Sequence, residues 1–347
     1  MNCEARESAL GYKVNCEARE GALGYKVNME NKNYKVNCKA REDALGYKIS
    51  IIGCGKVGMT TAYSILHDGV VNDLLLVDRN KSKIIGEQLD LEHGLSFLHH
   101  AHIDATDDYA NIKGSDLVII TAGVAQRPGD TRLDLANKNL KIIGEVIPKI
   151  VQHSPESIIL IVSNPVDVLT YKAYQLAGLP KGRIFGSGTT LDTARFRFHL
   201  SEFLKVNPRS IHAYILGEHG DNSFPVISSA SVGGQPLATI PGFSEERAEK
   251  AYSKARDAAY KIIASKGATY YAIGAVVAHI SRMVLTDDKS ILPVSIPLHG
   301  YKDISGIALS VPCIVGRDGV EKILDVKMSW DEKKKLQNAA EVLKKLL

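Results

Sequence analysis

The sequence predicts an α/β protein in which a doubly wound parallel sheet is followed by a mixed α+β domain. Short runs of Ile, Val and Leu alternate with longer amphipathic stretches, and a glycine-rich turn directly follows the first run. Such runs are typical of strands that are buried on both faces of a parallel sheet. Their alternation with helical patterns indicates the doubly wound arrangement. With 347 residues, 45% of them hydrophobic, the chain is long enough for two domains with buried cores.

The segment 1–48 differs from the rest of the chain. It opens with NCEARESALGYKV, which recurs with small changes at 15–27 and 37–48. These units are shorter than solenoid repeats and lack the apolar face that stacking requires, so we expect a disordered extension. Removing residues 36–48 would join MENKNYK to ISIIGCG. We therefore expect that Met29 begins the original protein and that the unit was multiplied later.

Residues 49–186 form the predicted parallel-sheet domain. Its apolar runs are the predicted strands, at 49–52, 74–77, 117–120 and 158–162. Amphipathic stretches lie between these runs, and the clearest of them, at 131–152, has the apolar periodicity of a helix.

Residues 187–347 form the predicted mixed α+β domain. Helices are expected at 191–205 and 244–265, and strands around 210–216, around 225–240 and within 291–327, with a turn at 317–319. The last helix is expected to begin at Ser329, because Ser329 and Glu332 have the spacing of a capping box.

The glycine-rich turn GCGKVG at 53–58 follows the first strand and opens a helix. Its glycines permit a tight turn, close approach of the backbone to a pyrophosphate, and close helix packing. The helix N-terminus adds free N–H groups and a positive dipole end. Asp78, at the end of the second strand, can accept hydrogen bonds from an adenosine ribose and repels a 2′-phosphate, although Arg79 could instead meet one. The pattern predicts a Rossmann domain that binds NAD.

Four further motifs follow: TAGVAQRPGDTR at 121–132, VSNPVD at 162–167, GSGTTLDTARFR at 186–197 and GEHGDNS at 217–223. Residues 49–330, which contain all of them in the family's order, resemble the L-lactate/malate dehydrogenase family. The resemblance implies an oxidoreductase that moves a hydride between nicotinamide and a small 2-oxo or 2-hydroxy acid.

The same resemblance assigns the chemistry to four side chains. His219 exchanges the proton at the substrate oxygen, a task that suits an imidazole with an unperturbed pKa near 6.5. Asp192 is its carboxylate partner, and Arg195, on the same helix face, binds the substrate carboxylate through two parallel hydrogen bonds. Arg132 polarises the substrate carbonyl. The structural alternatives are a helix N-terminal acid for Asp192 and a salt bridge for Arg195.

The resemblance also supplies a set of binding residues. Asn164, at a strand end, is expected to donate a hydrogen bond to the substrate oxygen, and Thr269 to line the pocket. The residues expected at the cofactor are Gly53, Gly55, Val57, Gly58, Asp78, Thr121, Ala122, Gly123, Val162 and Asn164. No metal ion is expected.

Substrate choice depends mainly on Gln126. Malate carries a second carboxylate that requires a cation, and malate-specific members typically have Arg at this position, whereas Gln126 is neutral. Together with GSGTTLD, this favours the lactate branch and pyruvate as substrate. Arg127 keeps the malate branch open, and a wider 2-hydroxyisocaproate-type pocket is a third alternative. A non-catalytic dinucleotide-binding protein would keep Asp78 but would not need the four catalytic side chains together.

Arg197 and His212 resemble the positions that bind fructose 1,6-bisphosphate in allosteric bacterial members of the family, where an Arg and a titratable His can hold a phosphate. The family also implies a homotetramer. A dispersed net charge of +4 argues against nucleic acid, and no unbroken apolar run is long enough for a membrane span. Five cysteines without a CxxC pair favour a reducing cytoplasm.

Overall fold

The computed structural model describes residues 46–124 and 132–347. The expected disordered extension and the Met29 start fall at 1–45, and Gln126 and Arg127 fall in the second gap, so these predictions lie outside the described residues. Residues 47–347 form one unit, and the domain boundary at 186/187 stays a prediction.

The first half of this unit contains a six-stranded parallel sheet in the order β3-β2-β1-β4-β5-β6. The strands are β1 (Lys48–Ile52), β2 (Asp73–Val77), β3 (His102–Thr106), β4 (Leu117–Ile120), β5 (Ile158–Ile161) and β6 (Ile184–Gly186). This order is that of the dinucleotide-binding fold, so the predicted doubly wound sheet is confirmed. The sequence did not reveal β3, where polar His102 and Asp104 interrupt the apolar run, or the very short β6.

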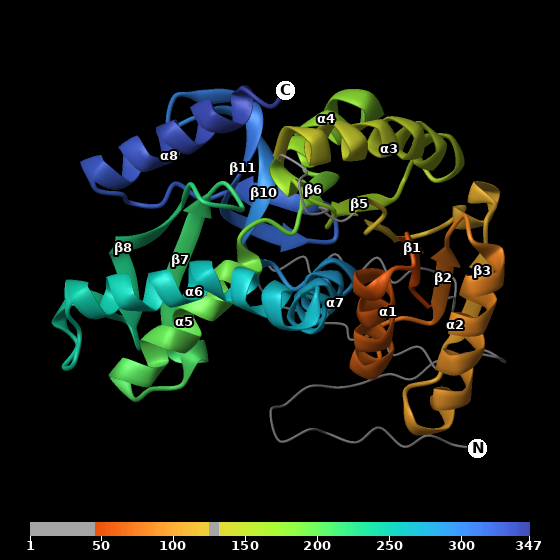
Figure 1. Ribbon diagram of the computed structural model, residues 1–347, viewed down its shortest axis with the longest axis horizontal. Helices are drawn as coiled ribbons and strands as arrows, with labels where there is room; N and C mark the ends of the chain where they lie inside the picture. Colours follow the sequence, from red (N-terminus) through yellow and green to blue (C-terminus); the bar gives the residue numbers. More distant parts are fainter. Residues whose placement is uncertain (1–45, 125–131) are drawn as a thin grey trace, which may run out of the picture. The chain divides into compact units, whose positions relative to one another are not determined.

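Helices cover both faces of this sheet (Figure 1). They are α1 (Lys56–Asp68), α2 (Lys81–Gly94), α3 (Arg132–His153) and α4 (Val166–Ala177), with the short 3₁₀ turns η1 (Leu95–Phe97) and η2 (Tyr109–Ile112). Strand residues alternate between two hydrophobic clusters. In β4, for example, Leu117 and Ile119 join α1 in one cluster, and Val118 and Ile120 join α3 in the other.

The second half adds antiparallel strands to the same sheet. Its elements are α5 (Thr190–Leu204), η3 (Pro208–Ser210), β7 (Ile211–Gly217), β8 (Ser223–Val232), β9 (Gln235–Pro236), η4 (Leu237–Thr239), α6 (Glu245–Lys266), α7 (Tyr271–Leu285), β10 (Ser290–Tyr301), β11 (Ile304–Gly316), β12 (Gly319–Ile323) and α8 (Trp330–Lys344). The strand order continues from β6 as β10-β11-β7-β8-β9, with β12 paired to β11. The two halves meet where Gly186 of β6 pairs with Ser295 of β10. The mixed α+β character of this half is confirmed.

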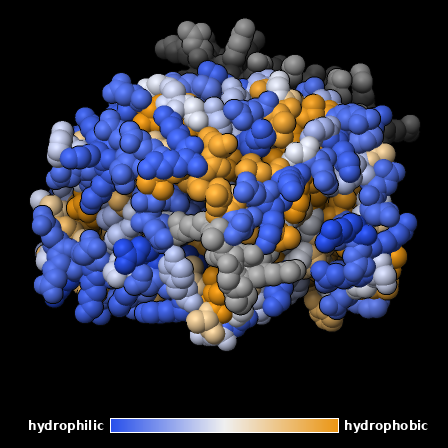
Figure 2. Space-filling model, turned by 45° about the horizontal axis from the view of Figure 1, so that its top comes forward, coloured by the Kyte–Doolittle hydropathy of each residue, from blue (hydrophilic) through white to orange (hydrophobic). Residues whose placement is uncertain are grey.

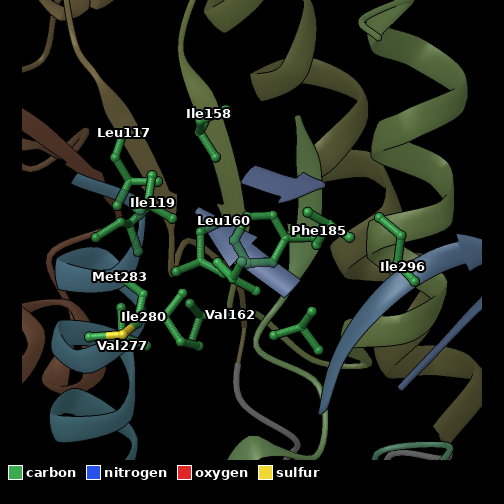
Figure 3. Packing of buried hydrophobic residues seen from close by; sticks show 14 of the residues in the cluster. Leu117, Ile119, Ile158, Leu160, Val162, Phe185, Val277, Ile280, Met283 and Ile296 are labelled. Atoms are coloured by element: carbon green, nitrogen blue, oxygen red, sulfur yellow. The ribbon is translucent and has the colours of Figure 1, made fainter. Parts of the chain in front are cut away.

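Helix α7 was not predicted, although its pattern can be seen in the sequence: Tyr271, Ala275 and His279 lie four residues apart and are exposed, while the opposite side is buried. Val277, Ile280 and Met283 pack into the cluster that contains Ile119 and Leu160 (Figure 3). α7 also runs beside α1 (Figure 1).

Helix α8 begins as predicted. The Ser329 hydroxyl accepts from the Glu332 N–H at 3.2 Å, and the Glu332 carboxylate accepts from the Ser329 N–H at 2.7 Å, which completes the capping box. Trp330, the first helical residue, is 71% exposed, and the Lys334 ammonium lies 4.8 Å from the centre of its ring. The helices of the described ranges include none that is long and apolar enough to cross a membrane.

Candidate active site

The turn between β1 and α1 is tightly packed at its first and third glycines. Gly53 has a φ of +95°, and a Cβ there would lie 2.4 Å from the Ala122 nitrogen. A Cβ at Gly58 would lie 2.2 Å from the Gly53 oxygen. At Gly55, by contrast, a Cβ would meet nothing within 4 Å. The backbone therefore folds back closely on itself and leaves open space in front of the middle glycine.

The residues around this turn fit a dinucleotide. α1 begins without a side-chain cap and without an acid in its first turn, where Val57 lies, so its N–H groups and dipole can face a pyrophosphate. The Asp78 carboxylate accepts hydrogen bonds from the N–H groups of Cys54, at 2.8 Å, and of Asn80, at 3.0 Å, which fixes it at the end of β2. The Lys83 ammonium donates to the Cys54 carbonyl at 2.5 Å, a contact that sequence reasoning missed.

The carboxyl ends of β4 and β5 lie next to this turn. Thr121, Ala122 and Gly123 follow β4, and Val162 and Asn164 follow β5. Asn139 of α3 joins the two ends, because its side chain donates to the Asn164 carbonyl at 2.7 Å and accepts from the Val124 N–H at 2.8 Å. Asn139 was not predicted, since nothing in its amphipathic helix marks it.

His219 and Asp192 lie together, although 27 residues separate them. His219 follows β7, Asp192 lies in the first turn of α5, and 2.6 Å separate Nδ1 of the histidine from Oδ2 of the aspartate. Their side chains are 28% and 16% exposed. Burial alone would lower the pKa of His219, but the carboxylates of Asp192 and Asp167 together outweigh burial and raise that pKa to about 9. Burial in turn opposes ionisation of Asp192, while His219 and Arg195 hold its pKa below the usual range. The pair is therefore imidazolium and carboxylate at neutral pH.

Arg195 completes this cluster. Its Nη1 lies 3.3 Å from Asp192 Oδ1, so the structural contact considered from the sequence is present. That contact occupies part of a guanidinium that has five N–H donors. Arg195, Asp192 and His219 all line a cavity of about 100 Å³.

One wall of the cavity comes from α6 and was not predicted. It is formed by Tyr252, Arg256 and Tyr260, which lie four residues apart on one helix face. That spacing is visible in the sequence and could have identified them. Tyr260 donates to Asp221 at 2.8 Å, next to the His219 loop.

The remaining predicted substrate residues are placed elsewhere or only partly described. Among the described residues that line this cavity, Asn164 and Thr269 are absent. Thr269 precedes α7 and is partly buried, and Arg132 is the first residue of α3. Asn164 is exposed beyond β5, where its side-chain oxygen accepts from the Val166 N–H at 3.3 Å.

Arg197 and His212 share one region of the α5/β7 surface. Arg197 donates to the Ala213 carbonyl at 2.9 Å, and its guanidinium lies 5.4 Å from the centre of the Tyr214 ring. Burial lowers the pKa of Arg197. His212 is exposed two residues before Tyr214, where the pairing of β7 with β8 is irregular. Arg197 also lines a separate cavity of about 270 Å³ together with His279.

Two family models match the chain. Residues 47–186 match the model described as lactate/malate dehydrogenase, NAD binding domain. Residues 189–347 match the model described as lactate/malate dehydrogenase, alpha/beta C-terminal domain.

Individual proteins are similar over most of their length. An L-lactate dehydrogenase of Thermoanaerobacterium saccharolyticum is 44% identical over 303 residues, which cover 85% of this chain and 96% of that protein. One of Kosmotoga olearia is 45% identical over 302 residues, covering 85% and 94%. The crystal structure of a lactate dehydrogenase from a Medee basin deep-sea metagenome superposes with a TM-score of 0.84 at 41% identity, covering 87% of this chain and 98% of that one.

Proposed function

The chain belongs to the lactate/malate dehydrogenase family, and from that premise we propose that it is an NAD-dependent L-lactate dehydrogenase in which His219 exchanges the proton. The reaction is the reversible reduction of pyruvate to L-lactate.

Each protein group has one task in this reaction. Bound NADH supplies a hydride to the carbonyl carbon of pyruvate. Since Nδ1 of His219 faces Asp192, the proton that passes to the carbonyl oxygen is that of Nε2. Asp192 stabilises the imidazolium, and Arg195 binds the substrate carboxylate. In the reverse direction the neutral imidazole accepts the hydroxyl proton of lactate.

Two further groups complete the proposed site around the carbonyl oxygen. Arg132 polarises it, and Asn164 donates a hydrogen bond to it. Thr269, partly buried before α7, is the remaining substrate position that the family resemblance implies.

The contact of 2.6 Å between His219 and Asp192 is the observation that carries this proposal. An imidazole in a partly buried site would ordinarily lose its proton near neutral pH. The adjacent carboxylate reverses that tendency and keeps a transferable proton in the cavity that Arg195 lines.

Pyruvate is the proposed substrate because Gln126 is neutral. The test compares kcat/KM for pyruvate and for oxaloacetate with NADH. We expect pyruvate to be preferred by at least ~100-fold, because an unpaired carboxylate in a dry site costs several kcal/mol. Gln126→Arg should reverse the order, whereas Gln152→Arg, at an exposed position of α3, should leave it unchanged. Equal kcat/KM values in the wild type would rule out the lactate assignment.

A regulatory role for Arg197 and His212 is a second proposal. The guanidinium against Tyr214 and the exposed imidazole of His212 in the same strand as Tyr214 supply a cation and a titratable group for a phosphate. Fructose 1,6-bisphosphate should lower the apparent KM for pyruvate in the wild type, and Arg197→Gln should abolish that effect. An unchanged wild-type KM near neutral pH would contradict the proposal.

A cytoplasmic homotetramer is the proposed assembly. Large apolar side chains are exposed in the single chain, among them Phe97 at 91% and Phe198 at 54%. Figure 2 shows apolar residues gathered in a band across one face, between hydrophilic areas. Such surface is typical of an interface. Sedimentation at micromolar protein should give four chains; a monomer would contradict the proposal. The buried free thiols of Cys54 and Cys313 suit a reducing compartment.

A further inference from the structure

We propose that Asp167 is a positioning residue for proton transfer: it anchors the backbone of His219 and its buried carboxylate helps to keep the imidazole protonated. This proposal rests on the function proposed for His219 and deepens it, because it assigns a second carboxylate to the same histidine.

Asp167 lies in the first turn of α4 and is 2% exposed. Its Oδ2 accepts a hydrogen bond from the His219 N–H at 2.7 Å. Its Oδ1 accepts one from the Ser295 hydroxyl of β10 at 2.6 Å. The carboxylate therefore joins three segments: the start of α4, the loop after β7, and the strand that connects the two halves of the sheet.

A purely local role does not explain these contacts. An acid in the first turn of a helix usually interacts with the dipole and the free N–H groups of its own helix. Asp167 instead receives its two hydrogen bonds from residues 52 and 128 positions away in the chain. Burying a charged group is costly unless it is fully hydrogen-bonded, so the position needs a reason beyond helix capping.

The two aspartates hold different parts of the histidine. Asp192 receives the ring Nδ1, and Asp167 receives the main-chain N–H. With both ends fixed, the ring loses freedom both to rotate and to shift with its loop. Such fixed geometry is what proton transfer over hydrogen-bond distance requires.

The ionisable groups around Asp167 and His219 determine the pKa values of these two residues. His219 and Glu218 act on Asp167, while Asp192, Asp167 and Arg195 act on His219. Burial raises the pKa of Asp167 to about 6, although the hydrogen bonds from Ser295 and His219 lower it. Asp167 is therefore ionised at neutral pH, and its charge adds to that of Asp192 in raising the pKa of His219.

Asp167→Asn tests the proposal, since it removes the charge with little change in shape. At pH 7 we expect kcat for pyruvate reduction to fall ~10-fold, because a neutral amide holds the His219 N–H less firmly than a carboxylate does. The alkaline fall of kcat/KM should move to lower pH by about one unit, because the imidazolium has lost a stabilising charge. The Kd of NADH, followed by its own fluorescence, should stay unchanged.

Two further variants serve as controls. Asp104→Asn, at an exposed carboxylate in β3 that pairs with His102, should alter neither kcat nor the pH profile. Ser295→Ala keeps the charge of Asp167 but removes a hydrogen bond that lowers its pKa. Because Asp167 stays ionised at alkaline pH, the alkaline fall should stay in place, while kcat at pH 7 should drop because the carboxylate that anchors His219 has lost one of its two hydrogen bonds.

The outcomes separate this inference from the proposed function. If the alkaline fall stays in place in Asp167→Asn while kcat drops, Asp167 acts only structurally and the inference is wrong. If Asp167→Asn does not fold, a Ser295→Ala variant that keeps the kcat of the wild type overturns the inference equally. A wild type that does not reduce pyruvate, despite binding NADH, would instead refute the proposed function.

Discussion

The imidazole of His219 retains its proton because two carboxylates, that of Asp192 at 2.6 Å and that of Asp167, together outweigh the effect of burial. Its pKa of about 9 gives the two directions of the reaction opposite pH dependences. Pyruvate reduction consumes the imidazolium, so kcat/KM should be level through neutral pH and fall above about pH 9. Lactate oxidation needs the neutral imidazole, so its kcat/KM should still be rising with pH above about pH 9.

Initial rates in both directions between about pH 6 and pH 10 measure this. An alkaline fall of pyruvate reduction centred near pH 6.5, the ordinary value for histidine, would show that Asp192 does not stabilise the imidazolium.

Asp192 and Asp167 also show what could be predicted from the sequence for single residues. The motif around Asp192 assigns it to His219 by resemblance, and the two lie together as expected. Asp167 belongs to a motif that was noticed, yet its bonds to His219 and Ser295 arise only when three distant segments fold together. Sequence position alone describes it as an ordinary first-turn acid.

The turn between β1 and α1 depends on the absence of side chains at specific glycines. Gly58→Ala would place a Cβ 2.2 Å from the Gly53 oxygen and force α1 away from the turn. We expect the Kd of NADH to rise at least ~10-fold, because the first-turn N–H groups would lose their alignment with the pyrophosphate.

Gly86→Ala is the matched control. Gly86 lies inside α2, where a Cβ would meet nothing within 4 Å. It should leave the Kd of NADH unchanged and raise the free energy of unfolding by about 0.5–1 kcal/mol, the helix preference for Ala over Gly. Equal Kd values for the two variants would contradict this account of the turn.

The capping box of α8 also connects the helix to a strand. The Glu332 carboxylate accepts from the N–H groups of Ile227, at 2.8 Å, Ser228, at 3.1 Å, and Ser329, at 2.7 Å. Ser329→Ala should lower the free energy of unfolding by about 1 kcal/mol, as other lost caps do. Glu332→Ala should cost roughly 2–3 kcal/mol, because it also leaves strand N–H groups of β8 without their acceptor. Urea unfolding measures the free energy of unfolding of both variants. Similar losses in Ser329→Ala and Glu332→Ala would mean that Glu332 acts only as a cap.

Helices and turns whose signals lie within a few neighbouring residues could be predicted from the sequence. Elements that are defined by their contacts with other helices and strands could not. The spacing of Ser329 and Glu332 and the glycines at 53–58 are local, and both structures formed as expected. Helix α7 has few polar residues on its exposed side, and its buried side packs on α1 and the sheet. Strand β6 is too short to recognise without its neighbours β5 and β10.

The buried carboxylate of Asp167 should lower the free energy of unfolding of the whole chain when it is ionised. Its pKa rises from 3.8 to about 6 on folding, so the folded state binds a proton more tightly than the unfolded state. The corresponding stability is complete below pH 3.8 and is lost as pH rises through about 6. Relative to the wild type, Asp167→Asn should therefore gain stability between about pH 4 and pH 7, by at most about 3 kcal/mol.

Urea unfolding of both proteins across that range measures the difference. If the difference in free energy of unfolding between the two proteins does not change with pH, Asp167 has the same pKa in the folded chain as in the unfolded one. Such a gain in stability alongside lower activity would identify a carboxylate that is retained for proton transfer at the expense of the fold.

The exposed indole at the start of α8 determines how this protein can be observed in solution. The chain has one tryptophan, Trp330, which is 71% exposed and lies against Lys334. Figure 1 shows α8 and α1 on opposite sides of the drawing. Tryptophan emission should therefore be that of a solvated indole, and it should report little of what happens at the glycine turn. A change in the emission wavelength or anisotropy of Trp330 would instead show that α8 has bound another protein surface. Trp330 fluorescence can therefore measure association independently of catalysis.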